Sequence, residues 1–320
     1  MTTFSRRQSL VALSWLGASS AWAQADRPVK FSLPNATTSG VDTITRLTQG
    51  ALTKALGHPV IVDNQPGAGG VVGMSALVRS APDGYTLSVV SNNVVIYPSL
   101  IKQLPFDPIA DVTPIAIVGA TPIIVVVNPK LAANNAKELV ALLRAKNGLI
   151  NYGSSGNGTI LHLAAEMFVD EAGATARHIP YKGVGPMLTD LIGGQIDMAT
   201  AALPSVQAHL KSGALRAIGV GAAQRVAAAP EILTMAAQGL PGYLVEGWFA
   251  VIGPKGMAPA DVKRIHEAVT IAFNNPEVKE AMARQGNTIA ISTPEFAAKF
   301  FRSETDKYPK LVKKAGLELQ

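Results

Sequence analysis

The feature that most constrains the fold is a repeated order of short apolar strand, polar loop and helix. Loops rich in Gly, Ser, Thr and Asn follow predicted strands that end at Leu33, Val90, Tyr152 and Pro180. A chain in which strands alternate with helices is typical of the α/β class with largely parallel sheets. Ligands bind beyond the carboxyl ends of such strands, so polar ends in both halves of the chain predict a ligand cleft between two domains.

The remaining elements fill out these two domains. Two apolar, β-branched runs, 115–118 and 123–127, predict two separate buried strands. A further extended segment is expected at 243–252, and long helices at about 259–274 and 294–315. With 320 residues, of which 48% are hydrophobic, the chain is long and apolar enough for two packed cores.

The stretch 151–162 carries the clearest chemistry. Its strand runs into a loop with Ser154, Ser155, Asn157 and Thr159, and the loop opens a helix with His162 in the first turn. Free backbone N–H groups at the positive end of a helix dipole, beside hydroxyl donors, form an anion pocket. We therefore expect a carboxylate or phosphate here. An ordinary N-capped helix after a glycine turn would have the same sequence.

Composition excludes several other classes. The net charge is +6, or +4 without Arg6 and Arg7 (6 − 2), and the excess is scattered, which argues against nucleic-acid binding. The chain has no cysteines, so disulfides, thiolate metal sites and a cysteine nucleophile are excluded. Its five histidines show no ligand-type spacing, so we expect no metal and no cofactor.

The N-terminus has the organisation of an export signal. Arg6 and Arg7 precede a short apolar run, 9–18, and small residues around Trp22 offer cleavage after Ala23 or Ala25. Residues 1–25 are therefore expected to be a signal peptide removed on export to the periplasm. Ser5-Arg6-Arg7 also allows a twin-arginine signal, but polar Ser9 favours general secretion. The apolar run is too short for a stable membrane anchor.

Five blocks, taken together, resemble a known family. They are NQPGAGG (64–70), APDGYTL (81–87), NYGSSGNGT (151–159), PYKG (180–183) and LTDLIGGQ (188–195). In their order and spacing they look like the signature blocks of the Bug receptors. These are the TctC-type periplasmic solute-binding proteins of tripartite tricarboxylate transporters. The similarity runs from about Val29 to the C-terminus.

The resemblance implies a hinged, two-lobe α/β binding protein of the Venus-flytrap kind, similar to type II. Lobe 1 would comprise 26–124 plus 249–320, and lobe 2 would comprise 125–248, with crossings near 123–128 and 246–252. Such a receptor is a monomer and not an enzyme. It carries a di- or tricarboxylate, an amino acid or an aromatic acid in its interdomain cleft, and it delivers this ligand to membrane permease subunits.

The same resemblance places donors to a ligand carboxylate on both lobes. The first lobe would contribute the loop after the first strand and the end of the third, and the second lobe would contribute the loop at 154–159 with its neighbours. The implied ligand-binding residues are Asn35, Thr37, Thr38, Ser39, Asp42, Ser91, Asn92, Asn93, Ser154, Ser155, Asn157, Thr159, His162, Tyr181 and Ala201. His162 could equally be a packed helical histidine, Asp42 a helix-start acid and Lys182 a solvated lysine rather than a counter-charge.

Two departures from the family pattern bear on the ligand. The loop 35–42 is about two residues longer than the usual Gly-Gly-Ser/Thr form. Ala201 and Ala202 stand where the family often has Asp-Asn. Loss of that carboxylate removes a partner for a ligand amino group and favours an apolar ligand body. The sequence thus predicts a carboxylate without an amino group, of the bulkier or aromatic kind.

Other functions have weaker support. A serine hydrolase could use Ser155 with His162, but GSSGN is not Gly-x-Ser-x-Gly and no triad order is present. A dinucleotide enzyme could use Gly67, Gly69 and Gly70, but their spacing does not match Gly-x-Gly-x-x-Gly. A third alternative, a ligand-sensing receptor that docks on a signalling partner, is not excluded by the sequence.

Overall fold

The computed structural model describes residues 27–314 and residue 317. The predicted signal peptide, with Arg6, Arg7 and both cleavage sites, lies outside the described residues. Among the helices of the described part, none combines the length and the apolar character needed to cross a membrane.

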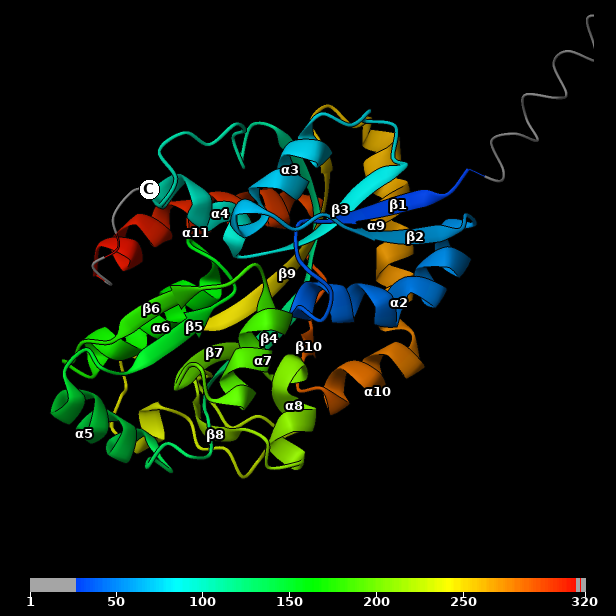
Figure 1. The fold of residues 1–320 in the computed structure, drawn as a ribbon. Coiled ribbons are helices and arrows are strands. Elements are labelled where there is room, and N and C mark those ends of the chain that lie inside the picture. The colour runs from blue at the N-terminus through cyan, green and yellow to red at the C-terminus, as the bar shows by residue number, and fades with distance from the viewer. Residues whose placement is uncertain (1–26, 315–316, 318–320) are drawn as a thin grey trace, which may run out of the picture.

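Strands and helices alternate along most of the described chain (Figure 1). The strands are β1 (Val29–Leu33), β2 (Val60–Asn64), β3 (Thr86–Ser91), β4 (Val112–Val127), β5 (Asn151–Ser154), β6 (Arg177–Pro180), β7 (Met198–Ala202), β8 (Arg216–Val220), β9 (Glu246–Pro254) and β10 (Thr288–Ile289). The α-helices are α2 (Gly40–Leu56), α3 (Val71–Val78), α4 (Asn93–Ile96), α5 (Ala136–Lys146), α6 (Ile160–Glu171), α7 (Val184–Gly193), α8 (Leu203–Lys211), α9 (Pro259–Asn274), α10 (Pro276–Arg284) and α11 (Pro294–Lys314). Short 3-10 turns are η1 (Ala68–Gly70), η2 (Tyr97–Ser99) and η3 (Ala236–Gln238).

The strands pair in the order β2-β1-β3-β9-β4-β7-β5-β6, with β8 and β10 also paired to β4. Pairs at both ends of this order are parallel, as the alternating pattern predicts. The middle is different, because β9 runs antiparallel to β3 and β4, and β4 runs antiparallel to β7 and β8. The prediction of largely parallel sheets is therefore wrong for the centre of the molecule.

The centre is antiparallel because two long strands pass from one lobe to the other (Figure 1). The runs 115–118 and 123–127, predicted as separate strands, form one strand, β4. Its first part, to Pro122, pairs with β9, and the part from Ile123 pairs with β7 and β8. At Gly119, φ is 153°, and a Cβ there would lie 1.9 Å from Thr288 O. Only glycine therefore lets β4 pass β10 at this point.

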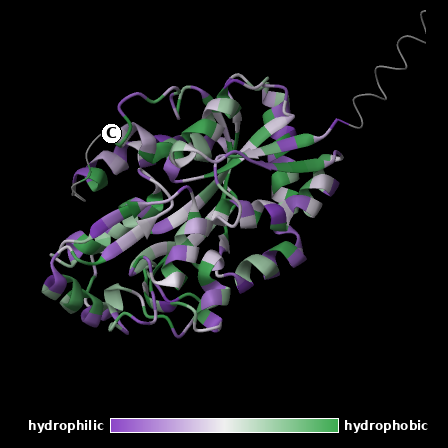
Figure 2. Cartoon of the chain, viewed as in Figure 1, coloured by the Kyte–Doolittle hydropathy of each residue, from purple (hydrophilic) through white to green (hydrophobic). Residues whose placement is uncertain are grey.

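The lobes share part of their core. One apolar cluster packs α2, α9 and β1 at the far side of lobe 1. A larger cluster runs from α4 through β4 into lobe 2 and includes Phe301 and Tyr308 of α11. Figure 2 shows apolar colours concentrated along the central strands and hydrophilic patches on the outer helices. A two-lobe α/β fold is confirmed, and the boundaries at 124/125 and 248/249 stay our proposal.

Candidate functional site

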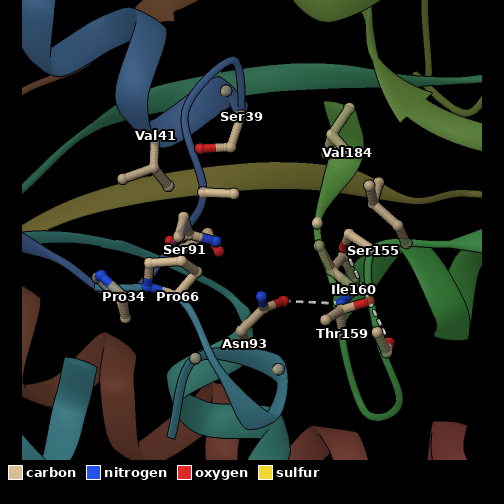
Figure 3. A pocket seen from close by; sticks show the side chains of 18 of the residues that line it. Pro34, Ser39, Val41, Pro66, Ser91, Asn93, Ser155, Thr159, Ile160 and Val184 are labelled. Carbon is tan, nitrogen blue, oxygen red and sulfur yellow. Dashed lines mark hydrogen bonds between the residues drawn. The ribbon is translucent and has the colours of Figure 1, made fainter. Parts of the chain in front are cut away.

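A cavity of about 960 Å³ lies between the lobes, where the carboxyl ends of β1 and β3 face those of β5, β6 and β7 (Figure 3). Lobe 1 contributes the loop after β1, the glycine-rich turn at 66–71 and the end of β3. Lobe 2 contributes the loop before α6 and the segment 180–184. The cleft predicted from the polar strand ends is present at the predicted edges of the sheets.

The helix start in lobe 2 differs in detail from the prediction. Thr159 caps α6, since its Oγ1 accepts from His162 N at 3.2 Å, while its own hydroxyl donates to Gly156 O at 2.8 Å. The N–H of Ile160 donates to Asn93 Oδ1 of lobe 1 at 2.7 Å. Two of the first-turn N–H groups that the sequence offered to an anion are therefore already bonded within the protein.

The two lobes touch around the cavity. Ser205 Oγ of α8 donates to Thr38 O of the loop after β1 at 3.0 Å. At Gly69, φ is 66°, and a Cβ there would lie 2.8 Å from the carbonyl oxygen of Asn157 in lobe 2. The glycine-rich turn thus lets the backbones of the two lobes approach closely beside the cavity.

About half of the predicted ligand-binding residues line the cavity. These are Asn35, Ser39, Ser91, Asn93, Ser155, Asn157, Thr159 and Tyr181. The others lie outside the lining and are Thr37, Thr38, Asp42, Asn92, Ser154, His162 and Ala201. Lys182 and Ala202, named in the sequence argument, also line it.

On lobe 1, the residues outside the lining have other partners. Thr37 and Thr38 are exposed. Asp42 is buried, accepts from Thr38 N at 3.0 Å and pairs with Arg46 Nε at 2.8 Å, so it braces the loop. Asn92 turns away from the cavity, because its Oδ1 accepts from Trp248 N and its Nδ2 donates to Tyr308 Oη.

On lobe 2, Ala201 is buried between the strands, and its neighbour Ala202 faces the cavity. Ser154 and His162 belong to a buried cluster beneath the loop. Ser154 Oγ lies 2.7 Å from His178 Nε2, and the rings of His162 and His178 stack with centroids 3.8 Å apart. His162 Nδ1 accepts from Gly158 N at 3.3 Å, so the ring supports the loop from behind.

Burial keeps these two imidazoles neutral. It lowers the pKa of His162 to about 3, with the nearby His178 adding to the effect, and it lowers the pKa of His178 to about 4. Burial also raises the pKa of Glu166, whose carboxylate accepts from Tyr152 Oη beside the rings. The cluster is structural support for the loop rather than part of the cavity surface.

Several lining residues were missed by the sequence argument. The turn 66–71, Ser205 and Phe249 all face the cavity, as do Ile101 and Gln103 in the connection after η2. The turn could have been found, since Gly67, Gly69 and Gly70 follow β2 in the same strand–loop–helix order as the other site loops. Phe249 and Ser205 carry no local signal, because β9 and α8 reach the cavity only through the fold.

The geometry gives Ser155 no general base. Its hydroxyl donates to Thr159 Oγ1 at 3.2 Å, and His162 Nδ1 is engaged with Gly158. Ser154, which does contact a histidine, is fully buried and outside the lining. The glycine-rich turn opens α3, but at Gly69 it lies against the carbonyl oxygen of Asn157 of the other lobe. The arrangement favours binding over ester hydrolysis or dinucleotide chemistry.

Comparison with known proteins decides the family. The sequence profile described as tripartite tricarboxylate transporter family receptor matches residues 44–317. The chain belongs to this family. It is 34% identical to the protein BugT of Bordetella pertussis over 296 residues, which cover 92% of this chain and 91% of that protein. The resemblance to the Bug receptors seen in the sequence is confirmed.

Solved structures agree with this assignment. The periplasmic binding protein BugD is 29% identical, with a TM-score of 0.88 over 92% of this chain and 99% of its own. An R. palustris protein solved with adipate is 25% identical, with a TM-score of 0.87 over 92% of this chain and 100% of its own. This chain is thus a solute-binding receptor of the TctC type, with the two-lobe fold of periplasmic binding proteins.

Proposed function

We propose that this receptor captures an organic carboxylate that lacks an amino group. The observation that carries the proposal is the charge of the cavity wall. Of the described residues that line the cavity, Lys182 alone carries a charge. A buried ammonium needs a carboxylate or several acceptors to compensate for its lost hydration. A wall with one cation and no carboxylate therefore favours acids over amino acids.

The shape of the wall supports an apolar ligand body. The side chains of Phe249 and Ala202 line the cavity next to Gly40. A Cβ added at Gly40 would lie 3.4 Å from the ring of Phe249 and 3.5 Å from the Cβ of Ala202. Val41 and Val184 add aliphatic surface from the two lobes (Figure 3). The adipate in the R. palustris relative is a dicarboxylate with an unbranched apolar middle. We expect acids with a chain or ring between polar ends to bind best.

Residues of both lobes would hold the carboxylate. The proposed ligand contacts are the predicted residues that line the cavity, Asn35, Ser39, Ser91, Asn93, Ser155, Asn157, Thr159 and Tyr181, with Lys182 as counter-charge. The ligand would stabilise the closed lobes by bridging them. In the periplasm, after cleavage of the signal peptide, the closed monomer would deliver its ligand to the membrane permease of a tripartite tricarboxylate transporter.

A matched pair of acids tests the ligand class. A thermal-shift screen of organic acids, followed by calorimetry, should show that glutarate binds more tightly than glutamate, which differs from it only by the α-amino group. Adipate and benzoate extend the panel to longer and aromatic acids. Glutamate binding as tightly as glutarate would contradict the proposal.

Two variants test the loop in lobe 2. Asn157→Ala and Ser155→Ala should each weaken binding of the best acid by roughly 1–2 kcal/mol, the scale of one buried hydrogen bond to a charged group. Asn274→Ala, in an exposed position on α9, is the matched control. Calorimetry that finds unchanged affinity in both loop variants would remove this loop from the ligand site.

A further inference from the structure

Asn93 joins the lobes from within the cavity. It is the first residue of α4 in lobe 1, separated from the end of β3 by Asn92, and its side chain is buried. Its Oδ1 accepts a hydrogen bond from the backbone N–H of Ile160, the first residue of α6 in lobe 2, at 2.7 Å. Figure 3 shows this bond spanning the space between the lobes.

The bond fixes which way the amide faces. A backbone N–H can only donate, so the oxygen of Asn93 must point at Ile160 and the NH₂ group must occupy the other branch. Asn93 lines the cavity, and Figure 3 shows its nitrogen turned to the space between the lobes. Among the hydrogen bonds of the described residues, none uses Nδ2 of Asn93. A free donor is thus held at the cavity surface.

This arrangement exists only when the lobes are together. In an open form Ile160 N–H has no partner in its own helix, because it belongs to the first turn. The amide of Asn93 would also be free to rotate. The backbone beside it is fixed in either case, since Asn92 is tied to Trp248 N at 2.8 Å and to Tyr308 Oη at 2.6 Å. Closure therefore changes the side chain of Asn93 and not its place in the fold.

We propose that Asn93 couples closure of the lobes to capture of the ligand. Its Oδ1 helps to hold the lobes together through Ile160, and the same bond presents Nδ2 as a donor to the anionic group of the ligand. The donor is in place only in the closed form, so a bound anion favours closure. This inference rests on the proposed binding of a carboxylate in the cleft.

Two substitutions separate the two halves of the amide. Asn93→Ala removes both the acceptor and the donor. Asn93→Asp keeps an oxygen that accepts from Ile160 N–H, and a carboxylate is favourable at the start of a helix. It replaces the NH₂ donor with a second, negatively charged oxygen. Asn274→Asp adds the same charge at an exposed position on α9 and is the control.

Lobe separation can be measured directly, because the chain has no cysteines. Labels on Lys54→Cys of α2 and Lys137→Cys of α5, both exposed, report the distance between the lobes by pulsed dipolar spectroscopy. Without any acid, Asn93→Ala should shift the distances to larger values, and Asn93→Asp should keep the distances of the unsubstituted protein. Identical distances in the Asn93→Ala protein would overturn the proposal.

Calorimetry with adipate tests the donor. Asn93→Ala and Asn93→Asp should both weaken adipate binding by about tenfold to a hundredfold, and Asn274→Asp should not. Full affinity in the Asn93→Asp protein would overturn the role of Nδ2. If the unsubstituted protein binds none of the acids in the panel, the proposed function fails, and the distances without acid still decide whether Asn93 holds the lobes together.

Discussion

At the scale of single residues, Thr38 has an unusual backbone conformation beside the site. Its φ is 67°, a conformation in which a β-branched side chain is strained. Two hydrogen bonds from side chains to its backbone hold it there. Its N–H donates to Asp42 Oδ2 at 3.0 Å, and its carbonyl oxygen accepts from Ser205 Oγ at 3.0 Å. The loop after β1 thus stores strain beside a contact between the lobes.

Replacing this threonine should therefore stabilise the protein. Thr38→Gly keeps both hydrogen bonds to the backbone of residue 38 and relieves the strain, so the free energy of unfolding should rise by about 1 kcal/mol. Thr37→Gly, at the exposed neighbour, has no positive φ to relieve and should lower it by about 0.5–1 kcal/mol. Urea denaturation measures both values, and a loss of stability with Thr38→Gly would contradict the strain.

Residue by residue, the site was predictable only in part. Ser91, Asn92 and Asn93 are consecutive polar residues, and the sequence gives no means of telling them apart. In the fold, Ser91 and Asn93 line the cavity, and Asn92 points towards Trp248 and Tyr308. The direction of a side chain after a strand depends on the turn that follows. The strand–loop–helix order predicts a helix after this loop but not where it starts, and α4 begins at Asn93 itself.

At the scale of elements, the buried ring of His162 on α6 stacks on the half-buried ring of His178 on the neighbouring strand β6. In the folded protein His162 and His178 have pKa values of about 3 and 4, below the usual 6.5. In the unfolded chain they bind protons as the pH falls through 6.5, whereas the folded form does not. Stability from this pair is thus present above pH 6.5 and is lost below it, down to about pH 4 for His178 and about pH 3 for His162.

These two histidines should consequently make the stability of the protein sensitive to acid. The free energy of unfolding should fall below pH 6.5 by up to about 1.4 kcal/mol per pH unit for each histidine. Burial raises the pKa of Glu166, so this group makes the folded protein more stable as the pH falls, but it is one group against two histidines. His178→Gln should reduce the loss between pH 7 and 5, measured by urea denaturation, relative to a His209→Gln control on α8 outside the cluster. Equal losses in the two variants would contradict this reading.

Elements with local signals were predicted, and elements set by the whole fold were not. The helix predicted after the polar loop that follows Leu33 is α2, and Ser39 caps it, with its Oγ accepting from Asp42 N. The strands after which polar loops were expected all exist. The continuity of β4 through Pro122 was missed, because proline usually ends a strand. Its antiparallel neighbours on both sides, β9 and β7, make the strand continuous, and their pairing is not local.

At the scale of the whole molecule, α11 is held against the beginning of β9 and the end of β3. Trp248 Nε1 donates to Glu304 Oε2 at 3.0 Å, and Asn92 Nδ2 donates to Tyr308 Oη at 2.6 Å. The same helix contacts α4 and also α6 of lobe 2. A buried polar network thus joins α11 to β9 and to the residue that follows β3.

Two buried tyrosines give a matched test of this network. Tyr308→Phe removes the hydroxyl that accepts from Asn92 Nδ2, and Nδ2 then keeps only its 3.3 Å hydrogen bond to Glu246 O. The free energy of unfolding should therefore fall by about 1–2 kcal/mol. Tyr243 is equally buried, but its hydroxyl has no hydrogen-bond partner in the described part of the chain. Tyr243→Phe should therefore be neutral or stabilising, because it removes an unsatisfied polar group. Urea denaturation compares the two, and equal effects would show that the hydroxyl of Tyr308 does not hold α11 to the crossing strands.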